Sequence, residues 1–574
     1  MNLFFDYQIK IFKSIKKLEK LKKIKIPSNI KSFTVEIPPK DQKADISCNA
    51  AMILSKINKT SPTEIAEILK KNLLSNFKEF KKIEIAQPGF LNIYFHISFW
   101  KEHLNKIISL NMKYGSNKVS KKKYNIEFVS ANPTGPLHVG HCRGAVIGDV
   151  IANLLKFNGH KVVKEYYVND HGEQIKTFVL SVYYRILEIN ENKIFPDNKN
   201  LYPGDYIIDI AKSIIKKKAI KNYNNFEKIY NKLSSESLKA SMELIKHNLN
   251  LLGIEHNNFV YESNLINNKV VSRVVKKLEK NKYIYKGKLQ APKGELTKNW
   301  KEREQLLFKS TIFGDDLDRP LQKADGTWTY FAGDMGYHSD KISRRFDTLI
   351  NILGADHAGY IKRIVSATKA ISDNKVNLIC KVSQLVKLFK NGQPFKMSKR
   401  KGDYITVEDL IKEVGKDSTR FIMLNRSNDV ELDFDFEKVT EKSKDNPVFY
   451  VQYAYARINS VFRLLKLNLE DKIKLDKEFN LNEYEIEILK KISEWPRCIE
   501  ISSNKLEPHR IPFYLYQLVT LFHAYWNLGK DNKEFRFVYE NGNFNASRLA
   551  LLQTLSMVIK NGMSILGVST PRIM

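Results

Sequence analysis

The chain has 574 residues, more than a single hydrophobic core usually supports, so we expect about two to four domains. Its 95 Lys and Arg against 63 Asp and Glu give a formal net charge of +32 and a pI near 9.6, which favours a polyanionic partner, nucleic acid before membrane, over lysines that are merely solvated. Four scattered cysteines without a CxxC pair argue against disulfides or structural zinc, and with no apolar run near the roughly 18 residues of a membrane span we expect a cytoplasmic protein.

Residues 1–115 combine the strand and helix signals of a small α+β domain. The runs FTVEIPP and LNIYFHI read as short strands, and a QPGF turn signal precedes the second. Between these runs, apolar residues recur at helical spacing.

A βαβ unit opens the next domain. YNIEFV predicts a strand, ANPTGPLH a loop, VGHCRGAVIGDVIANLLKF (139–157) a helix and KVVKEYYV a second strand. The two strands are then parallel, and the loop lies at the carboxyl end of the first, where ligands bind in such folds.

Strand signals return at 348–353 and 376–382, so we expect an α/β domain over 120–435, with a lysine-rich helical insertion at about 185–305. Thr406 and Asp409 form a capping box that opens a helix. Beyond 445 only helical spacing remains, through a final helix that stops at Gly562, which predicts an all-α bundle over 445–574.

The HVGH stretch carries the first candidate chemistry. His138 and His141 are three residues apart around Gly140, at the start of a helix whose free N–H groups favour phosphate. Two imidazoles beside that helix end suit nucleotidyl transfer. An HxxH pair can also bind a metal, but no third ligand of matching spacing lies nearby, and a plain Pro- and Gly-rich turn would not need both histidines.

A lysine-rich loop, KMSKRKGD, follows at 396–403. The alternative reading is a charged loop that is simply solvated. Paired with HVGH, its ammonium groups form the other half of a phosphate clamp, which neutralises a transferring α-phosphate and pyrophosphate.

The order and spacing of HVGH and KMSKR resemble the HIGH and KMSKS signatures of class I aminoacyl-tRNA synthetases. SANPTGPLHVGH, YYVNDHG, GDDLDRPLQKADGTWTYFAGDMGYH and the closing LGVSTPRIM resemble the arginyl-tRNA synthetase family, over essentially the entire chain. Arg572 departs from it, where an acidic residue is usual. The resemblance implies a multidomain α/β protein: a class I Rossmann-type catalytic domain with a parallel sheet, an N-terminal α+β tRNA-binding domain and a C-terminal all-α anticodon-binding bundle.

The resemblance also implies the reaction: ATP-dependent activation of L-arginine to arginyl-adenylate, then transfer to tRNA(Arg), with activation favoured by bound tRNA. We expect a monomer, with Mg²⁺ arriving on the phosphate oxygens of ATP and no structural metal. His138, His141, Lys396 and Lys399 would stabilise the transition state. The expected ATP-binding residues are His138, Gly140, His141, Asp356, His357, Lys396, Met397 and Lys399.

An arginine site needs carboxylates, because a guanidinium offers five donors and no acceptor. In the resembling family the positions of Glu127, Ser130, Asn132, Tyr330 and Asp334 contact the amino acid, and we expect Asp334 to anchor the side chain. The alternatives are core packing for Tyr330 and a strand-face charge for Glu127.

The bundle carries aromatic residues interleaved with polar ones, a mixture suited to stacking unpaired bases. Such aromatics are more often core residues, but here they fall on more than one helix face. The expected tRNA-binding residues are Tyr450, Tyr453, Arg457 and Tyr525.

Three rivals remain. A cysteinyl or glutamyl enzyme of the same class would be expected to show zinc-ligand cysteines or an arginine-rich carboxylate site. A non-catalytic RNA-binding descendant would not need intact HVGH and KMSKR, and a small nucleotidyltransferase would explain neither the length nor the bundle.

Overall fold

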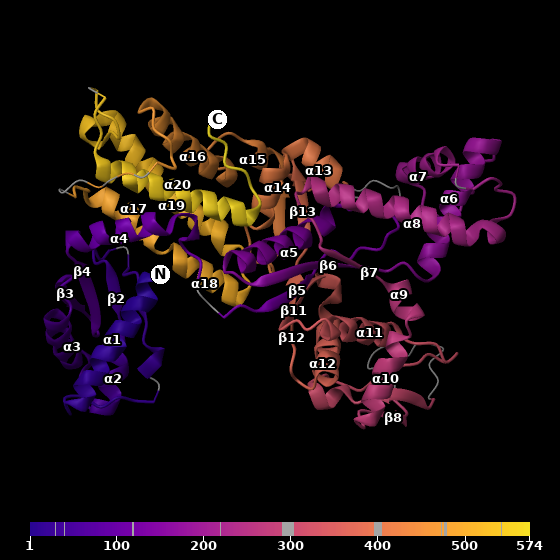
Figure 1. Ribbon diagram of the computed structural model, residues 1–574, viewed down its shortest axis with the longest axis horizontal. Helices are drawn as coiled ribbons and strands as arrows, with labels where there is room; N and C mark the ends of the chain where they lie inside the picture. The colour runs from indigo at the N-terminus through magenta and orange to yellow at the C-terminus, as the bar shows by residue number, and fades with distance from the viewer. Residues whose placement is uncertain are drawn as a thin grey trace.

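Figure 1 shows an N-terminal domain beneath a C-terminal helical bundle, with a central α/β domain beside them. A helical segment projects from the central domain, away from the bundle, at the right of the view. The structure is a computed structural model. It describes residues 1–574 apart from 29, 40, 118–119, 219, 290–302, 395–404, 472, 474, 476–478 and 541.

The N-terminal domain is a four-stranded antiparallel sheet, in the order β1-β2-β4-β3, with helices packed on it. Its first helix begins where the side chain of Asn2 accepts a hydrogen bond from the backbone of Phe5, and it buries one apolar face. The elements are α1 (Leu3–Lys20), η1 (Ile30–Ser32), β1 (Val35–Glu36), β2 (Ile46–Cys48), α2 (Ala50–Asn58), α3 (Pro62–Asn76), β3 (Phe80–Ala86), β4 (Phe90–Phe95), α4 (Ile97–Leu110) and η2 (Asn111–Lys113).

The central domain is built on a five-stranded parallel sheet in the order β12-β11-β5-β6-β7. In chain order this is 3-2-1-4-5, read from β7, so the winding reverses between β5 and β11, and the crevice beyond their carboxyl ends is the expected ligand site. The elements are β5 (Lys123–Glu127), α5 (Val139–Phe157), β6 (Lys161–Val168), β7 (Asn258–Tyr261), α11 (Tyr330–Ser343), β11 (Thr348–Gly354), η4 (Ala355–Tyr360), α12 (Ile361–Ser372) and β12 (Asn377–Ser383).

The predicted helical insertion at about 185–305 is only partly helical. Three helices form a small core of their own between β6 and β7, but β7 then returns to the parallel sheet, and a three-stranded antiparallel sheet follows in the order β10-β9-β8. The strand NFVY is too short and too isolated among Lys- and Asn-rich helices to signal itself by periodicity. The elements are α6 (Glu173–Glu191), α7 (Asp205–Lys216), α8 (Phe226–Leu251), α9 (Glu262–Asn267), α10 (Val270–Lys280), β8 (Ile284–Gly287), β9 (Gln305–Phe308), η3 (Ser310–Phe313) and β10 (Arg319–Pro320).

A small sheet, β14-β13-β15, and three short helices join the parallel sheet to the bundle. The predicted capping box is confirmed, since Thr406 and Asp409 exchange side-chain and backbone hydrogen bonds at the start of α13. The elements are β13 (Val386–Lys390), β14 (Gln393–Pro394), α13 (Val407–Val414), α14 (Lys416–Met423), β15 (Leu432–Asp435) and α15 (Phe436–Thr440).

The C-terminal bundle centres on its last helix, α20, which packs on α5 of the catalytic domain and on α4. Contrary to the sequence analysis, α20 is long and apolar enough to cross a membrane, but 83% of that window is buried inside the protein, as in a core helix. It also runs past Gly562, to a left-handed cap at Gly567 with φ of 69°. The elements are α16 (Pro447–Leu464), α17 (Glu483–Ser493), α18 (Trp495–Lys505), α19 (Arg510–Asp531), η5 (Lys533–Phe535) and α20 (Ala546–Leu566).

Candidate active site

The loop after β5 delivers two histidines to the amino-terminal end of α5. His138 is the N-cap: the Gly140 amide donates to its Nδ1 at 3.1 Å, and the His138 amide donates to Nδ1 of His141 at 3.3 Å. Because both Nδ1 atoms accept, each neutral ring carries its proton on Nε2 as a donor. A Cβ at Gly140 would lie 2.9 Å from Cε1 of His138, so only glycine leaves room for this arrangement.

The segment after the predicted lysine loop pairs with the same stretch. The Val139 amide donates to the Ile405 carbonyl at 3.1 Å, and the Val407 amide donates to the Leu137 carbonyl at 2.8 Å. The backbones of Thr406 and His138 form an isolated antiparallel β-bridge. Lys396, Met397 and Lys399 lie outside the described residues, and their predicted roles stay predictions.

Asp356 and His357 lie where the sequence analysis expected them, directly after β11 at the carboxyl edge of the sheet. Their side chains are 78% and 66% exposed, and Nε2 of His357 lies 3.4 Å from Oδ2 of Asp356. Since β11 pairs with β5, this exposed pair borders the crevice at the switch point.

The backbone turns sharply as it leaves β5. Val129 and Ser130 have φ of 71° and 43°, left-handed values that cost a non-glycine residue about 1–3 kcal/mol and cluster at functional sites. The turn allows the Ser130 hydroxyl to donate to Oε1 of Glu127 at 3.1 Å and to accept from the Tyr167 amide at 3.1 Å. Asn132 donates to Gln174 of α6 at 2.6 Å.

Asp334 lies on α11, and its Oδ2 accepts a hydrogen bond from the Tyr360 hydroxyl at 2.5 Å. Burial, and after it the carboxylates of Glu127 and Glu262, raise the pKa of Asp334 to about 7, against the opposing effects of Tyr360 and Lys341. Near neutral pH this carboxyl group is therefore only partly ionised, and a cation that binds beside it stabilises the ionised form.

The structure does not bring Tyr330 into this group. It is the first residue of α11, its side chain is 79% exposed, and Lys323 lies over its ring at 5.4 Å. Its predicted contact with the amino acid therefore stays a prediction that the side chain would have to turn to fulfil.

Glu262, which the sequence analysis missed, completes the acidic group. It begins α9 directly after β7, and its Oε1 lies 3.9 Å from where a Cβ on Gly333 would stand, one residue before Asp334. Burial raises its pKa. The signal that could have found it is an acidic residue at the carboxyl end of a strand, but that strand, β7, was itself hidden in the predicted insertion.

Tyr167 sits among these carboxylates. Burial first, and then Glu262, Asp334, Glu127 and Asp170, raise the pKa of its hydroxyl. Among the described residues, Asp334 and Glu262 form no ion pair with a Lys, Arg or His, although the charges of Lys341 and His171 act on them to lower their pKa values, so this edge of the crevice holds two carboxyl groups suited to a guanidinium.

An aromatic surface on the bundle gathers three of the four residues predicted to bind RNA. Arg457 stacks over the ring of Tyr453 at 4.2 Å and lies 2.9 Å from Nδ1 of His523, whose ring lies 4.2 Å from that of Tyr450. All are partly exposed except His523, which is buried beneath them.

The prediction for Tyr525 is wrong. Its side chain is 1% exposed and its hydroxyl donates to the buried carboxylate of Glu485. When a helix has aromatic residues on several faces, the sequence does not show which face is exposed. Here the tyrosine hydroxyl finds its hydrogen-bond partner within the core.

No group of three or more His, Cys, Asp or Glu is placed to hold a metal ion in the part of the chain that the structure describes.

Three family descriptions match the chain: "Arginyl tRNA synthetase N terminal domain" over residues 5–95, "tRNA synthetases class I (R), catalytic domain" over 103–462 and "DALR anticodon binding domain" over 451–574. The chain is 56% identical over its whole length to the "Arginine--tRNA ligase" of Pelagibacter ubique, all of which is covered, and 42% identical to that of Brucella anthropi, of which 99% is covered. A putative arginyl-tRNA synthetase from Campylobacter jejuni superposes with a TM-score of 0.72 at 31% identity, covering 83% of this chain and 100% of that one. The Thermus thermophilus enzyme, at 17% identity, a TM-score of 0.70 and 99% coverage of both chains, shares the fold.

Proposed function

Since the chain belongs to the arginyl-tRNA synthetase family and is a class I arginine–tRNA ligase, we propose how its own residues divide the work. The observation that carries the proposal is the pair of carboxylates without cationic partners, Asp334 and Glu262, beside the crevice that the helix end at His138 also borders. Asp334 and Glu262 bind the guanidinium of arginine, and the turn at Ser130 and Asn132 holds its α-amino end.

In the first step an oxygen of the arginine carboxylate attacks the α-phosphorus of ATP, and pyrophosphate leaves with the electron pair of the broken P–O bond. His138 and His141 donate through Nε2–H to phosphate oxygens whose charge rises, and Lys396 and Lys399 neutralise the α-phosphate and the leaving pyrophosphate. ATP enters as its Mg²⁺ complex, with the ion held through phosphate oxygens.

In the second step a terminal ribose hydroxyl of tRNA attacks the arginyl carbonyl carbon, and AMP leaves. Neither step needs a covalent nucleophile from the protein, so positioning and charge stabilisation supply the rate. The aromatic surface at Tyr450, Tyr453 and Arg457 stacks unpaired bases of the anticodon loop.

Arginine affinity should depend on pH through Asp334. The guanidinium binds the carboxylate form, so affinity is full above the raised pKa of about 7 and is lost as pH falls through it. We expect the arginine dissociation constant, measured by calorimetry, to rise about tenfold from about pH 8 to about pH 6. The same titration on Asp334→Asn should have a smaller slope, left by Glu262, whose pKa is also raised, and an equal slope in both proteins would assign the titration to another group.

Substitutions on the aromatic surface should weaken tRNA binding without affecting arginine. Arg457→Ala removes a cation that stacks on Tyr453, and we expect the tRNA dissociation constant to rise about tenfold, since base stacking is worth about 1–3 kcal/mol. Tyr484→Ala, an exposed aromatic on α17, is the matched control and should change little. Equal losses in both variants would refute a localised surface.

We also propose that the enzyme works as a cytoplasmic monomer. The four cysteines are unpaired, as in a reducing compartment. Light scattering of the purified protein should give a mass near 66.7 kDa.

A further inference from the structure

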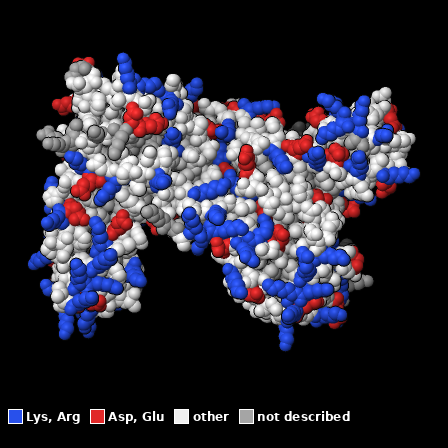
Figure 2. Space-filling view, in the orientation of Figure 1, with Lys and Arg blue, Asp and Glu red and all other residues white. Residues whose placement is uncertain are grey.

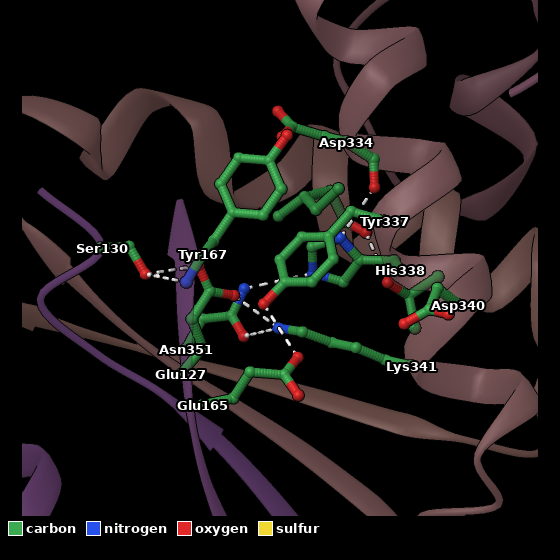
Figure 3. A network of polar contacts seen from close by, with 12 residues as sticks. Glu127, Ser130, Glu165, Tyr167, Asp334, Tyr337, His338, Asp340, Lys341 and Asn351 are labelled. Carbon is green, nitrogen blue, oxygen red and sulfur yellow. Dashed lines mark hydrogen bonds and ion pairs between the residues drawn. The ribbon is translucent and has the colours of Figure 1, made fainter. Parts of the chain in front are cut away.

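A buried lysine stands beside the first of the site's carboxylates. Lys341 of α11 has no exposed side-chain surface, and its Nζ donates to Oε2 of Glu127 at 2.5 Å and to Oδ1 of Asn351 at 3.1 Å. The ammonium also lies 4.3 Å from the centre of the Tyr337 ring. Figure 3 shows these groups converging on the nitrogen of Lys341.

Donor and acceptor can be assigned for each hydrogen bond that links Lys341 to Asn351, Asn351 to His338 and His338 to Asp334. Asn351 uses its oxygen to accept from Lys341, so its Nδ2 donates to Nε2 of His338 at 3.1 Å, and Nδ1 of His338 donates to the backbone carbonyl of Asp334 at 2.9 Å. Asn351 is also the sheet partner of Glu127. This series of hydrogen bonds therefore connects Glu127 with the backbone carbonyl of Asp334, and every donor and acceptor in it is assigned.

The charges at the two ends differ. Glu127 is paired with Lys341, and its predicted contact with arginine stays a prediction, whereas Asp334 and Glu262 form no ion pair with a Lys, Arg or His among the described residues. Arginine itself has two cations, the guanidinium and the α-ammonium, and without Lys341 the crevice would offer both of them two negative ends of similar strength.

We propose that Lys341 is a positioning residue that makes arginine bind one way round. By occupying the cation position at Glu127, it leaves Asp334 and Glu262, among the residues that the structure describes, as the strong site for the guanidinium, so the substrate carboxylate points toward the helix end at His138. This inference rests on the proposed role of Asp334.

Removal of the lysine charge should permit reversed binding, in which the carboxylate is away from ATP. Reversed binding occupies the enzyme without turnover, so it lowers kcat and the arginine KM by the same factor and leaves kcat/KM unchanged. A residue that only supports the fold, or that acts on the transition state, would lower kcat/KM instead.

The test is Lys341→Met in arginine-dependent pyrophosphate exchange with total tRNA present. We expect kcat and KM to fall together by about twofold, because two binding modes of similar affinity share the bound arginine equally, and Lys341→Arg to restore both toward wild type. A fall in kcat/KM that matches the fall in kcat would overturn the proposal.

Agmatine, which has both cations of arginine but no carboxylate, is the equilibrium probe. It should inhibit Lys341→Met about tenfold more tightly than wild type, and equal inhibition would count against the proposal. Should the single variant not fold because Glu127 is left buried and unpaired, Lys341→Met with Glu127→Gln removes both charges. Agmatine should then bind as in wild type, and a tenfold change would overturn the inference.

The proposed function fails in a different way. If Asp334 did not bind the guanidinium, Asp334→Asn would keep its arginine KM whatever Lys341→Met did.

Discussion

Lys399→Ala is expected to lower kcat for adenylate formation about 10²-fold, with the arginine KM close to wild type. The lysine acts on charge that develops on the α-phosphate and on pyrophosphate, so its loss is felt in the transition state more than in the bound substrate. Initial rates of pyrophosphate exchange at varied arginine and saturating ATP measure both constants.

The matched control for this prediction is Lys401→Ala, on the same KMSKRKGD segment. Lys401 carries the same charge but stands outside the KMSKR motif, so we expect less than about a threefold change. If the two alanine variants lost activity equally, the loop would contribute net charge only and Lys399 would have no individual role. A matching rise in the arginine KM would instead point to a collapsed loop.

Asp334→Asn is expected to raise the arginine KM at least about tenfold while ATP binding is retained, because a charge-assisted hydrogen bond to a guanidinium is worth about 1.5–3 kcal/mol. The asparagine keeps the shape of the side chain and can still accept from Tyr360, so the fold is preserved. Exchange kinetics at varied arginine, with ATP binding measured separately, give the comparison.

Asp340→Asn is the control on the same helix. Asp340 pairs with Arg344 at 3.1 Å and is partly exposed, so its loss should leave the arginine KM unchanged. An unchanged KM in Asp334→Asn would remove Asp334 from the site.

The strongly periodic elements could be predicted from the sequence. The helix at 139–157 was predicted residue for residue, because its apolar stripe and the loop before it indicate the same boundary. β7 could not be predicted, since four half-buried residues at the sheet edge carry no period, and Glu262 was lost with it. Tyr525 shows the other limit: the mixture of aromatic and polar residues indicated an exposed surface, but such a mixture does not say which side chains are buried.

Contacts between segments far apart in the chain could not be predicted from the sequence either. Arg420 of α14 is fully buried, pairs with Asp149 of α5 and donates to the Leu566 carbonyl of α20 at 2.7 Å. The bundle is therefore part of the packing around the ATP-site helix, and a chain ending near Glu441 would expose that helix and its buried charges. Communication between tRNA and the active site has to be tested in the full-length enzyme.

The most direct test of the account is pyrophosphate exchange by the purified chain with each of the twenty amino acids, with and without total tRNA. We expect exchange with arginine alone, increased by tRNA. Exchange with lysine or any other amino acid at a comparable rate, or no arginine-dependent exchange when tRNA is present, would contradict it.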